Sequence, residues 1–164
     1  MRELLIDGAR RAWDEERRFV AIADRTEPGT HERWSAKDLV AHVAAARQRL
    51  ADALASETPT LEHDEAEVYA AHEDDGWAQV ERDALRAHEQ LLARMECEPL
   101  DGDRPWLRDR SLTSTFAGYA VRHPLGHLAE YHRDRGEEAE AVRIDDVRAA
   151  ILARLPHEVA HPPG

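Results

Sequence analysis

The stretch Trp34-Ser35-Ala36-Lys37-Asp38-Leu39-Val40-Ala41-His42-Val43 predicts the start of a long helix. Ser35 is a typical N-cap residue, and Asp38, three residues later, can return a hydrogen bond to its backbone in a capping box. Apolar residues then recur at helical spacing up to about Ser56. They are Leu39, Val43, Ala46, Leu50 and Leu54. The stretch therefore predicts an amphipathic helix with His42 at the edge of its apolar stripe.

The same periodicity predicts further helices along the chain. They cover about residues 3–24, 64–71, 75–95, 111–135 and 144–155. Gly136 is a natural C-cap, Pro156 ends the last helix, and runs of strand-forming residues are missing from the sequence. We therefore expect an all-α fold, a four-helix bundle with extra short helices. One domain is expected over residues 1–156, followed by a mobile tail over residues 157–164.

Composition narrows the class of protein. The 164 residues are 42% hydrophobic and 34% charged, which is typical of a soluble globular domain. A net charge of −12 argues against nucleic acid and anionic membrane surfaces as partners. The N-terminal segment lacks the apolar core of a signal peptide, and no apolar run approaches the ~20 residues of a membrane helix. With Cys97 as its single cysteine, the chain is expected in the cytoplasm.

Three histidines are the clearest candidates for chemistry: His42, His123 and His127. His123 and His127 are four residues apart, so on a helix they differ by only about 40° in azimuth and can reach one ion. With His42 from another helix, three neutral imidazoles would form an open site for a divalent metal. Alternatively, His42 is a hydrogen-bonded core histidine and the spacing of the other two is coincidental.

Pro124 complicates the second helix of this site. Inside a helix it removes one hydrogen bond and clashes with the preceding turn. The helix is expected either to kink there or to restart with Pro124 in its first turn and His123 as a cap. Either outcome affects the direction of His123.

Other candidates are weaker. His132 follows His127 by five residues, about 140° round the helix, so a surface role is expected for it. Residues 157–161, His-Glu-Val-Ala-His, have the spacing of zinc proteases, but they lie between prolines at the end of the chain without a downstream third ligand. Cys97 is flanked by two glutamates, which disfavour a reactive thiolate.

Four residues have possible supporting roles. Trp34 and Trp106 adjoin the loops before the histidine-bearing helices, where they could wall a pocket or cap the ends of the bundle. Glu130 or Asp38 could accept a hydrogen bond from a ligand histidine and orient it.

These motifs resemble a known group of proteins. Residues 34–43 resemble the first motif of the DinB/YfiT-like four-helix proteins. Residues 123–131, His-Pro-Leu-Gly-His-Leu-Ala-Glu-Tyr, resemble their second motif, although a proline and a glycine inside it are unusual. The middle of the chain, from Val68 to Trp106, resembles the DfsB/ClbS branch, which includes a colibactin self-resistance protein with cyclopropane hydrolase activity.

The resemblance implies metal binding by His42, His123 and His127, with zinc or nickel as the expected ion, and a homodimer. It also implies activity on electrophilic small molecules, by hydrolysis, isomerisation or transfer of a low-molecular-weight thiol such as bacillithiol, mycothiol or glutathione. The alternative is a non-catalytic stress protein that binds a small molecule or a metal.

Overall fold

The computed structural model describes residues 1–56, 59–61, 64–101, 104–107 and 110–160, and no strand occurs among them. The helices are α1 (Arg2–Ile22), α2 (Ala36–Ala55), α3 (Glu65–His72), α4 (Trp77–Cys97), α5 (Leu112–Ala117), α6 (His123–Asp134), α7 (Glu138–Leu152) and α8 (His157–Ala160). Two further elements are the 3₁₀ turn η1 (Pro105–Leu107) and the π-helical segment η2 (Gly118–Arg122). The predicted all-α fold is confirmed.

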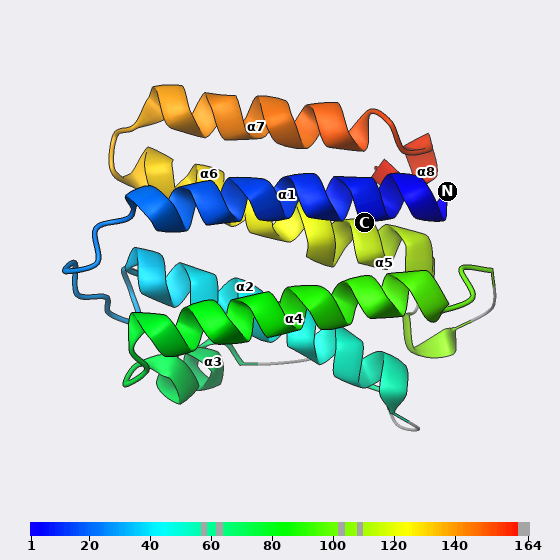
Figure 1. Ribbon diagram of the computed structural model, residues 1–164, viewed down its shortest axis with the longest axis horizontal. Coiled ribbons are helices and arrows are strands. Elements are labelled where there is room, and N and C mark those ends of the chain that lie inside the picture. Colours follow the sequence, from blue (N-terminus) through cyan, green and yellow to red (C-terminus); the bar gives the residue numbers. More distant parts are fainter. Residues whose placement is uncertain (57–58, 62–63, 102–103, 108–109, 161–164) are drawn as a thin grey trace.

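The long helices lie side by side along one axis (Figure 1). α2 packs against α4, α7 packs against α6, and α1 lies between these pairs and contacts α4, α6 and α7. α5, η2 and α6 follow one another as a helical path that runs antiparallel to α2 (Figure 1). Because α2 contacts both η2 and α6, the helices that carry the three histidines face each other.

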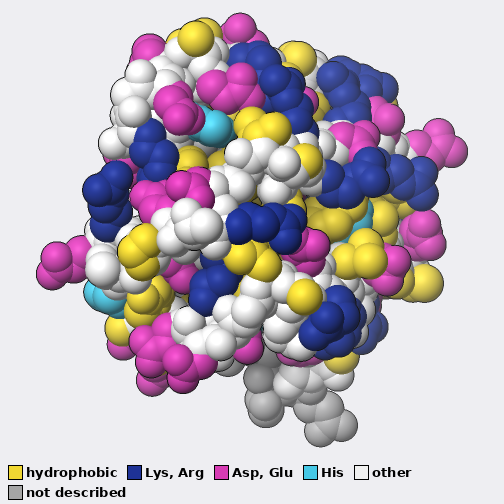
Figure 2. Space-filling model, turned by 60° about the vertical axis from the view of Figure 1, so that its left-hand side comes forward, with side chains coloured by type: hydrophobic (Ala, Val, Ile, Leu, Met, Phe, Trp, Pro, Cys, Tyr) yellow, Lys and Arg dark blue, Asp and Glu magenta, His cyan; other side chains and the backbone are white. Residues whose placement is uncertain are grey.

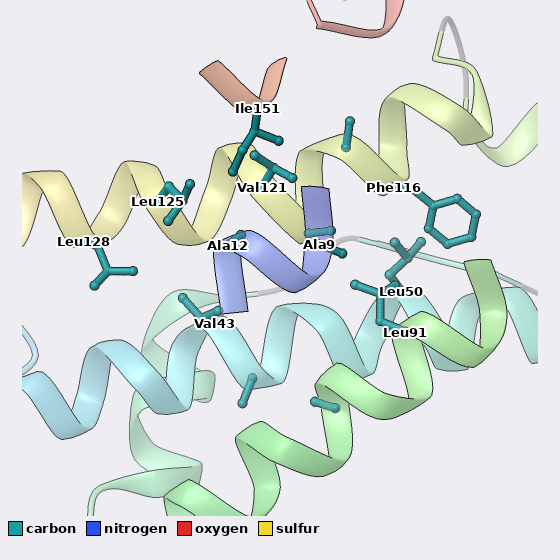
Figure 3. Packing of buried hydrophobic residues seen from close by; sticks show 14 of the residues in the cluster. Ala9, Ala12, Val43, Leu50, Leu91, Phe116, Val121, Leu125, Leu128 and Ile151 are labelled. Atoms are coloured by element: carbon teal, nitrogen blue, oxygen red, sulfur yellow. The ribbon is translucent and has the colours of Figure 1, made fainter. Parts of the chain in front are cut away.

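Buried apolar side chains from all these helices form one core. Small residues of α1, among them Ala9 and Ala12, point between α2 and the path through η2 and α6 (Figure 3). A side chain at Gly8 would come within 2.9 Å of Ile151 Cγ2, so α1 and α7 approach closely there. Larger side chains fill the space on either side. They include Val43, Leu50, Leu91, Phe116, Val121, Leu125 and Leu128.

The capping box predicted at the start of α2 is present. Ser35 Oγ accepts a hydrogen bond from the backbone N–H of Asp38 at 3.3 Å, and Asp38 Oδ2 accepts one from the backbone N–H of Ser35 at 2.9 Å. The preceding loop packs on this cap, since a Cβ added to Gly29 would lie 1.6 Å from Asp38 Oδ2. The first turn of α2 and the loop before it therefore hold each other in place.

Pro124 is accommodated by a π-helical turn. The backbone N–H of His123 donates to Gly118 O, five residues back, and α6 begins at His123 with Pro124 in its first turn. His123 itself has helical dihedral angles (φ −64°, ψ −56°), so it does not act as a non-helical cap. The chain stays helical from Leu112 to Asp134, and the wider turn adapts the path to the proline.

The expected start of the last long helix is wrong. α7 begins at Glu138 rather than at about residue 144, and Glu138 and Glu140 lie in its first turn, where negative charge is favourable. Residues 157–160, the first part of the expected tail, form a short helix: Val159 is buried, and its carbonyl accepts a hydrogen bond from Arg122 Nη1 at 2.7 Å. Residues 161–164, the rest of the expected tail, lie outside the described residues.

A buried polar cluster joins α1, α2 and α4. The Arg47 side chain, 1% exposed, donates from Nη1 to Glu16 Oε2 at 2.7 Å and from Nη2 to Glu16 Oε1. Trp13 lies beside this pair, with the Arg47 guanidinium 5.8 Å from its ring and the His88 ring stacked on it at 4.6 Å. Burial, followed by the charge of Arg47, lowers the pKa of His88 to about 4.

Removing the charge of Glu16 should destabilise the fold. Glu16→Gln leaves the Arg47 guanidinium buried without its counter-charge, so we expect the free energy of unfolding to fall by about 3–5 kcal/mol. The matched control is Asp14→Asn in the pair Asp14–Arg17, whose side chains are each 64% exposed. It should cost less than about 0.5 kcal/mol. Urea unfolding measures both, and equal losses would contradict the prediction.

His88 should make stability depend on pH. Its folded-state pKa of about 4 lies below its ordinary 6.5, so the unfolded chain takes up the proton first as the pH falls. The resulting stability is present above pH 6.5 and is lost as the pH falls toward 4. We expect a loss of about 1 kcal/mol between pH 7.5 and 5.5. His88→Phe, which keeps a ring beside Trp13, should lose less over the same interval in urea unfolding. A loss as large as in the wild type would rule out His88 as the cause.

Candidate metal centre

The three predicted histidines converge. His42 comes from the second turn of α2, and His123 and His127 come from the first turns of α6. His123 Nε2 lies 3.1 Å from His42 Nε2 and 3.2 Å from His127 Nε2. One nitrogen from each ring lies within 4.8 Å of the other two, so the three residues could hold a metal ion. His42 is buried and the other two are half-buried, so the cluster is open on the side of α6.

The central nitrogen is close to two neighbours at once. A ring nitrogen carries either one hydrogen or one lone pair, so His123 Nε2 cannot form a normal in-plane hydrogen bond with both neighbours. A cation that accepts all three lone pairs satisfies the arrangement. With metal–nitrogen distances of about 2.1 Å, separations of 3.1 and 3.2 Å correspond to ligand angles of about 95–100°. Such angles are near those of four- and six-coordinate ions and leave positions open for other ligands.

A carboxylate lies behind one of the candidate ligands. Glu130 Oε2 is 3.2 Å from His127 Nδ1, three residues earlier on α6. A proton on Nδ1 that is shared with Glu130 leaves the lone pair of Nε2 directed at the cluster. Asp38, the other residue expected in this role, accepts hydrogen bonds from the backbone and the hydroxyl of Ser35 instead. Its carboxylate therefore belongs to the helix cap.

Two aromatic rings flank the histidines. The Trp34 ring lies 4.5 Å from the His42 ring and 6.1 Å from the His127 ring, as expected for a wall of the site. The Tyr119 ring, which was not anticipated, is stacked beside His123 at 6.2 Å. Burial raises the pKa of Tyr119, while the charges of Arg49 and Arg110 oppose this rise. Trp106 packs against the hydrophobic core.

The loop that carries Trp34 is fastened to the end of α6. Arg135 donates to both carboxylate oxygens of Glu27 at 2.8 Å and to the backbone carbonyl of Trp34 at 3.1 Å. The Tyr131 hydroxyl donates to Glu27 Oε2 at 3.1 Å, and the Arg135 guanidinium lies over the Tyr131 ring. The hydrogen bond from Arg135 lowers the pKa of Glu27, and burial raises the pKa of Tyr131 to about 12. Sequence reasoning missed this network, which joins residues more than a hundred positions apart.

A small pocket adjoins His42 on the side of α3. Its free space of about 10 Å³ is close to that of one water molecule. Trp34, Asp38, Ala41, His42, Val68, Tyr69 and His72 line it. His72 is held by Asp75, with His72 Nδ1 2.9 Å from Asp75 Oδ2. His72 thus lines the same pocket as His42 without belonging to the three-histidine cluster.

The weaker candidates lie apart from the three histidines. His132 does not join them, as expected, but its predicted surface role is wrong: it is buried and forms a hydrogen bond with Glu137 through Nδ1. Cys97 is exposed at the end of α4. Of residues 157–161, the first four form α8, and His161 lies outside the described residues.

The face of the molecule shown in Figure 2 has basic and acidic side chains interspersed. Among the described residues, no helix combines the length and the apolar character needed to cross a membrane. A scan against models of protein families finds no match, and searches of curated proteins and of solved structures find none either.

The cluster predicts one metal ion per chain. Purified protein without a histidine tag should bind one equivalent of zinc or nickel, and His42→Ala or His127→Ala should abolish stoichiometric binding. Glu130→Gln should weaken the affinity about tenfold, because it removes the carboxylate behind His127. His72→Ala is the matched control and should bind as the wild type does. Calorimetric titration with elemental analysis measures these values, and a wild type that takes up no metal would contradict the assignment.

Proposed function

We propose that this chain is a metal-dependent protein of the DinB/YfiT-like four-helix type, nearest the DfsB/ClbS branch. Its activity would be hydrolysis of an electrophilic small molecule or transfer of a low-molecular-weight thiol to it. The observation that supports this proposal best is the convergence of His42, His123 and His127 at one point. The resemblance of residues 34–43 and 123–131 to this family supports the proposal of a homodimer, and the single cysteine supports that of a cytoplasmic location.

The arrangement of the helices fits this proposal. α1, α2, α4 and the path through α5, η2 and α6 are the four long elements of the proposed bundle, and α7 packs against two of them. The two motifs that carry the resemblance lie on α2 and α6, which contact each other. Segments about eighty residues apart thus contribute to one cluster.

The surrounding residues have distinct roles in the proposed chemistry. A zinc or nickel ion, when bound, lowers the pKa of a water or a thiol and so makes a nucleophile available at neutral pH. Glu130 fixes the orientation of His127, and the capping box of α2 fixes that of His42. Trp34 shields the rings of His42 and His127 from solvent on one side. An electrophilic group would enter from the half-buried side, where His123 and His127 are accessible.

The small size of the pocket beside His42 favours a second function. This pocket has space for about one water molecule, which is too little for a substrate. In this alternative, the protein is a non-catalytic module that holds a metal or a small ligand during stress.

Turnover separates the two functions. Zinc- or nickel-loaded protein should consume electrophiles such as epoxides or activated cyclopropanes, with or without added thiol, and His127→Ala should reduce the rate to that of buffer. Glu130→Gln should reduce it about tenfold through its effect on the ion. His72→Ala should retain the wild-type rate. Product analysis by mass spectrometry distinguishes hydrolysis from thiol transfer. Metal-loaded protein that leaves all electrophiles at their background rates would favour the binding module.

A further inference from the structure

Two polar residues lie one to two turns from the three histidines on the facing helices. Arg49 follows His42 by seven residues on α2, so the two residues differ by only about 20° in azimuth and share a face. Tyr119 precedes His123 by four residues on η2, about one turn. Because the two helical paths are antiparallel and in contact, Arg49 and Tyr119 are displaced from the histidines in the same direction (Figure 1).

Two observations connect Tyr119 with these groups. The Tyr119 ring is stacked beside His123, with 6.2 Å between their centroids and 26° between their planes. The positive charges of Arg49 and Arg110 each favour the ionised form of the Tyr119 hydroxyl, although burial outweighs them and raises its pKa. The charges of two arginines therefore act on a phenol that is stacked beside a candidate ligand.

Arg49 lacks an acidic partner within the described part of the chain. The protein has 34 acidic residues, and several of its arginines form ion pairs with them, as Arg47 does with Glu16. Arg49 forms no hydrogen bond or ion pair with any described residue, and its Nη1 is shielded from solvent. A shielded guanidinium N–H without an acceptor is costly, so a water or a ligand with an acceptor oxygen at this position would stabilise it.

We propose that Arg49 and Tyr119, with Arg110 at the rim, form a subsite for a carboxylate, so that the substrate class is small organic acids. This inference rests on the proposed function, in which the three histidines hold the ion that takes the reactive end of the molecule. Arg49 supplies a planar pair of N–H donors that matches a carboxylate, and the Tyr119 hydroxyl donates a third hydrogen bond. The backbones of His42 and Arg49 are about 10 Å apart along α2. The arginine side chain is long, so the distance left between its guanidinium and the ion is one that a small molecule can span.

A pair of thiols of equal length tests this subsite. Zinc-loaded protein is titrated calorimetrically with 3-mercaptopropionate and with 3-mercapto-1-propanol. The two thiols differ only at the end of the chain, where the first has a carboxylate and the second a hydroxymethyl group. We expect the acid to bind at least about tenfold more tightly, since hydrogen bonds to a charged group are the strong ones. Arg49→Gln and Tyr119→Phe should each reduce this preference to less than about threefold and leave the affinity of the alcohol unchanged. Arg49→Lys should keep part of the preference for the acid. The control is Arg17→Gln, at an exposed arginine paired with Asp14, and it should keep the whole preference.

The outcomes separate this inference from the proposed function. A wild type that binds neither zinc nor thiol would overturn both. Zinc binding with equal affinity for the two thiols would overturn the subsite and leave the metal centre in place. A preference that survives both Arg49→Gln and Tyr119→Phe would show that the carboxylate binds elsewhere. If Arg49→Gln loses helical content by circular dichroism, Tyr119→Phe and Arg49→Lys decide the result.

Discussion

The capping box at the start of α2 determines where His42 points. Ser35 and Asp38 satisfy each other's backbone groups and so fix the first residue of the helix. A shift of one residue in this start would rotate every side chain of α2 by about 100° and would turn His42 away from α6. Asp38 Oδ2 accepts hydrogen bonds from the backbone N–H and from the hydroxyl of Ser35, and both bonds stabilise the first turn of α2. Asp38 is therefore a structural residue, although it lies one turn before a candidate ligand.

On the facing path through α5 and α6, the π-helical segment η2 determines the direction of the side chains that follow it. A π-helical turn contains more residues than an α-helical one, so it changes the direction of the side chains that follow it. The buried residues of α5 and the histidines of α6 can thus both face inward along one path. Pro124, which first suggested a defect next to His123, lies directly after this turn. The proline and the wide turn together give His123 its central position between the other two histidines.

Local patterns predicted most of the helices and the pairing of His123 with His127, whereas the convergence of His42 with that pair was one of two alternatives and was favoured by the resemblance to a known family. Apolar periodicity, the Ser35–Asp38 cap and Gly136 all act over a few residues, and i, i+4 spacing defines the pair on α6. The start of α7 was missed because acidic residues suit both a loop and the first turn of a helix. The partners of Glu16, Glu27 and His88 were beyond prediction, because they come from other helices and depend on packing rather than on spacing. His132 was misplaced for the same reason, since its burial depends on Phe19 and Glu137.

The two arginines near the middle of α2 show how the chain divides its charges. Arg47 and Arg49 are two residues apart, so they project about 200° apart on opposite sides of the helix. Arg47 is directed at α1, where Glu16 neutralises it within the core. Arg49 is on the side of His42, and no described acidic residue neutralises it, although acidic residues exceed basic ones by twelve. In the proposed subsite, the charge of Arg49 would favour an anionic ligand over a neutral one.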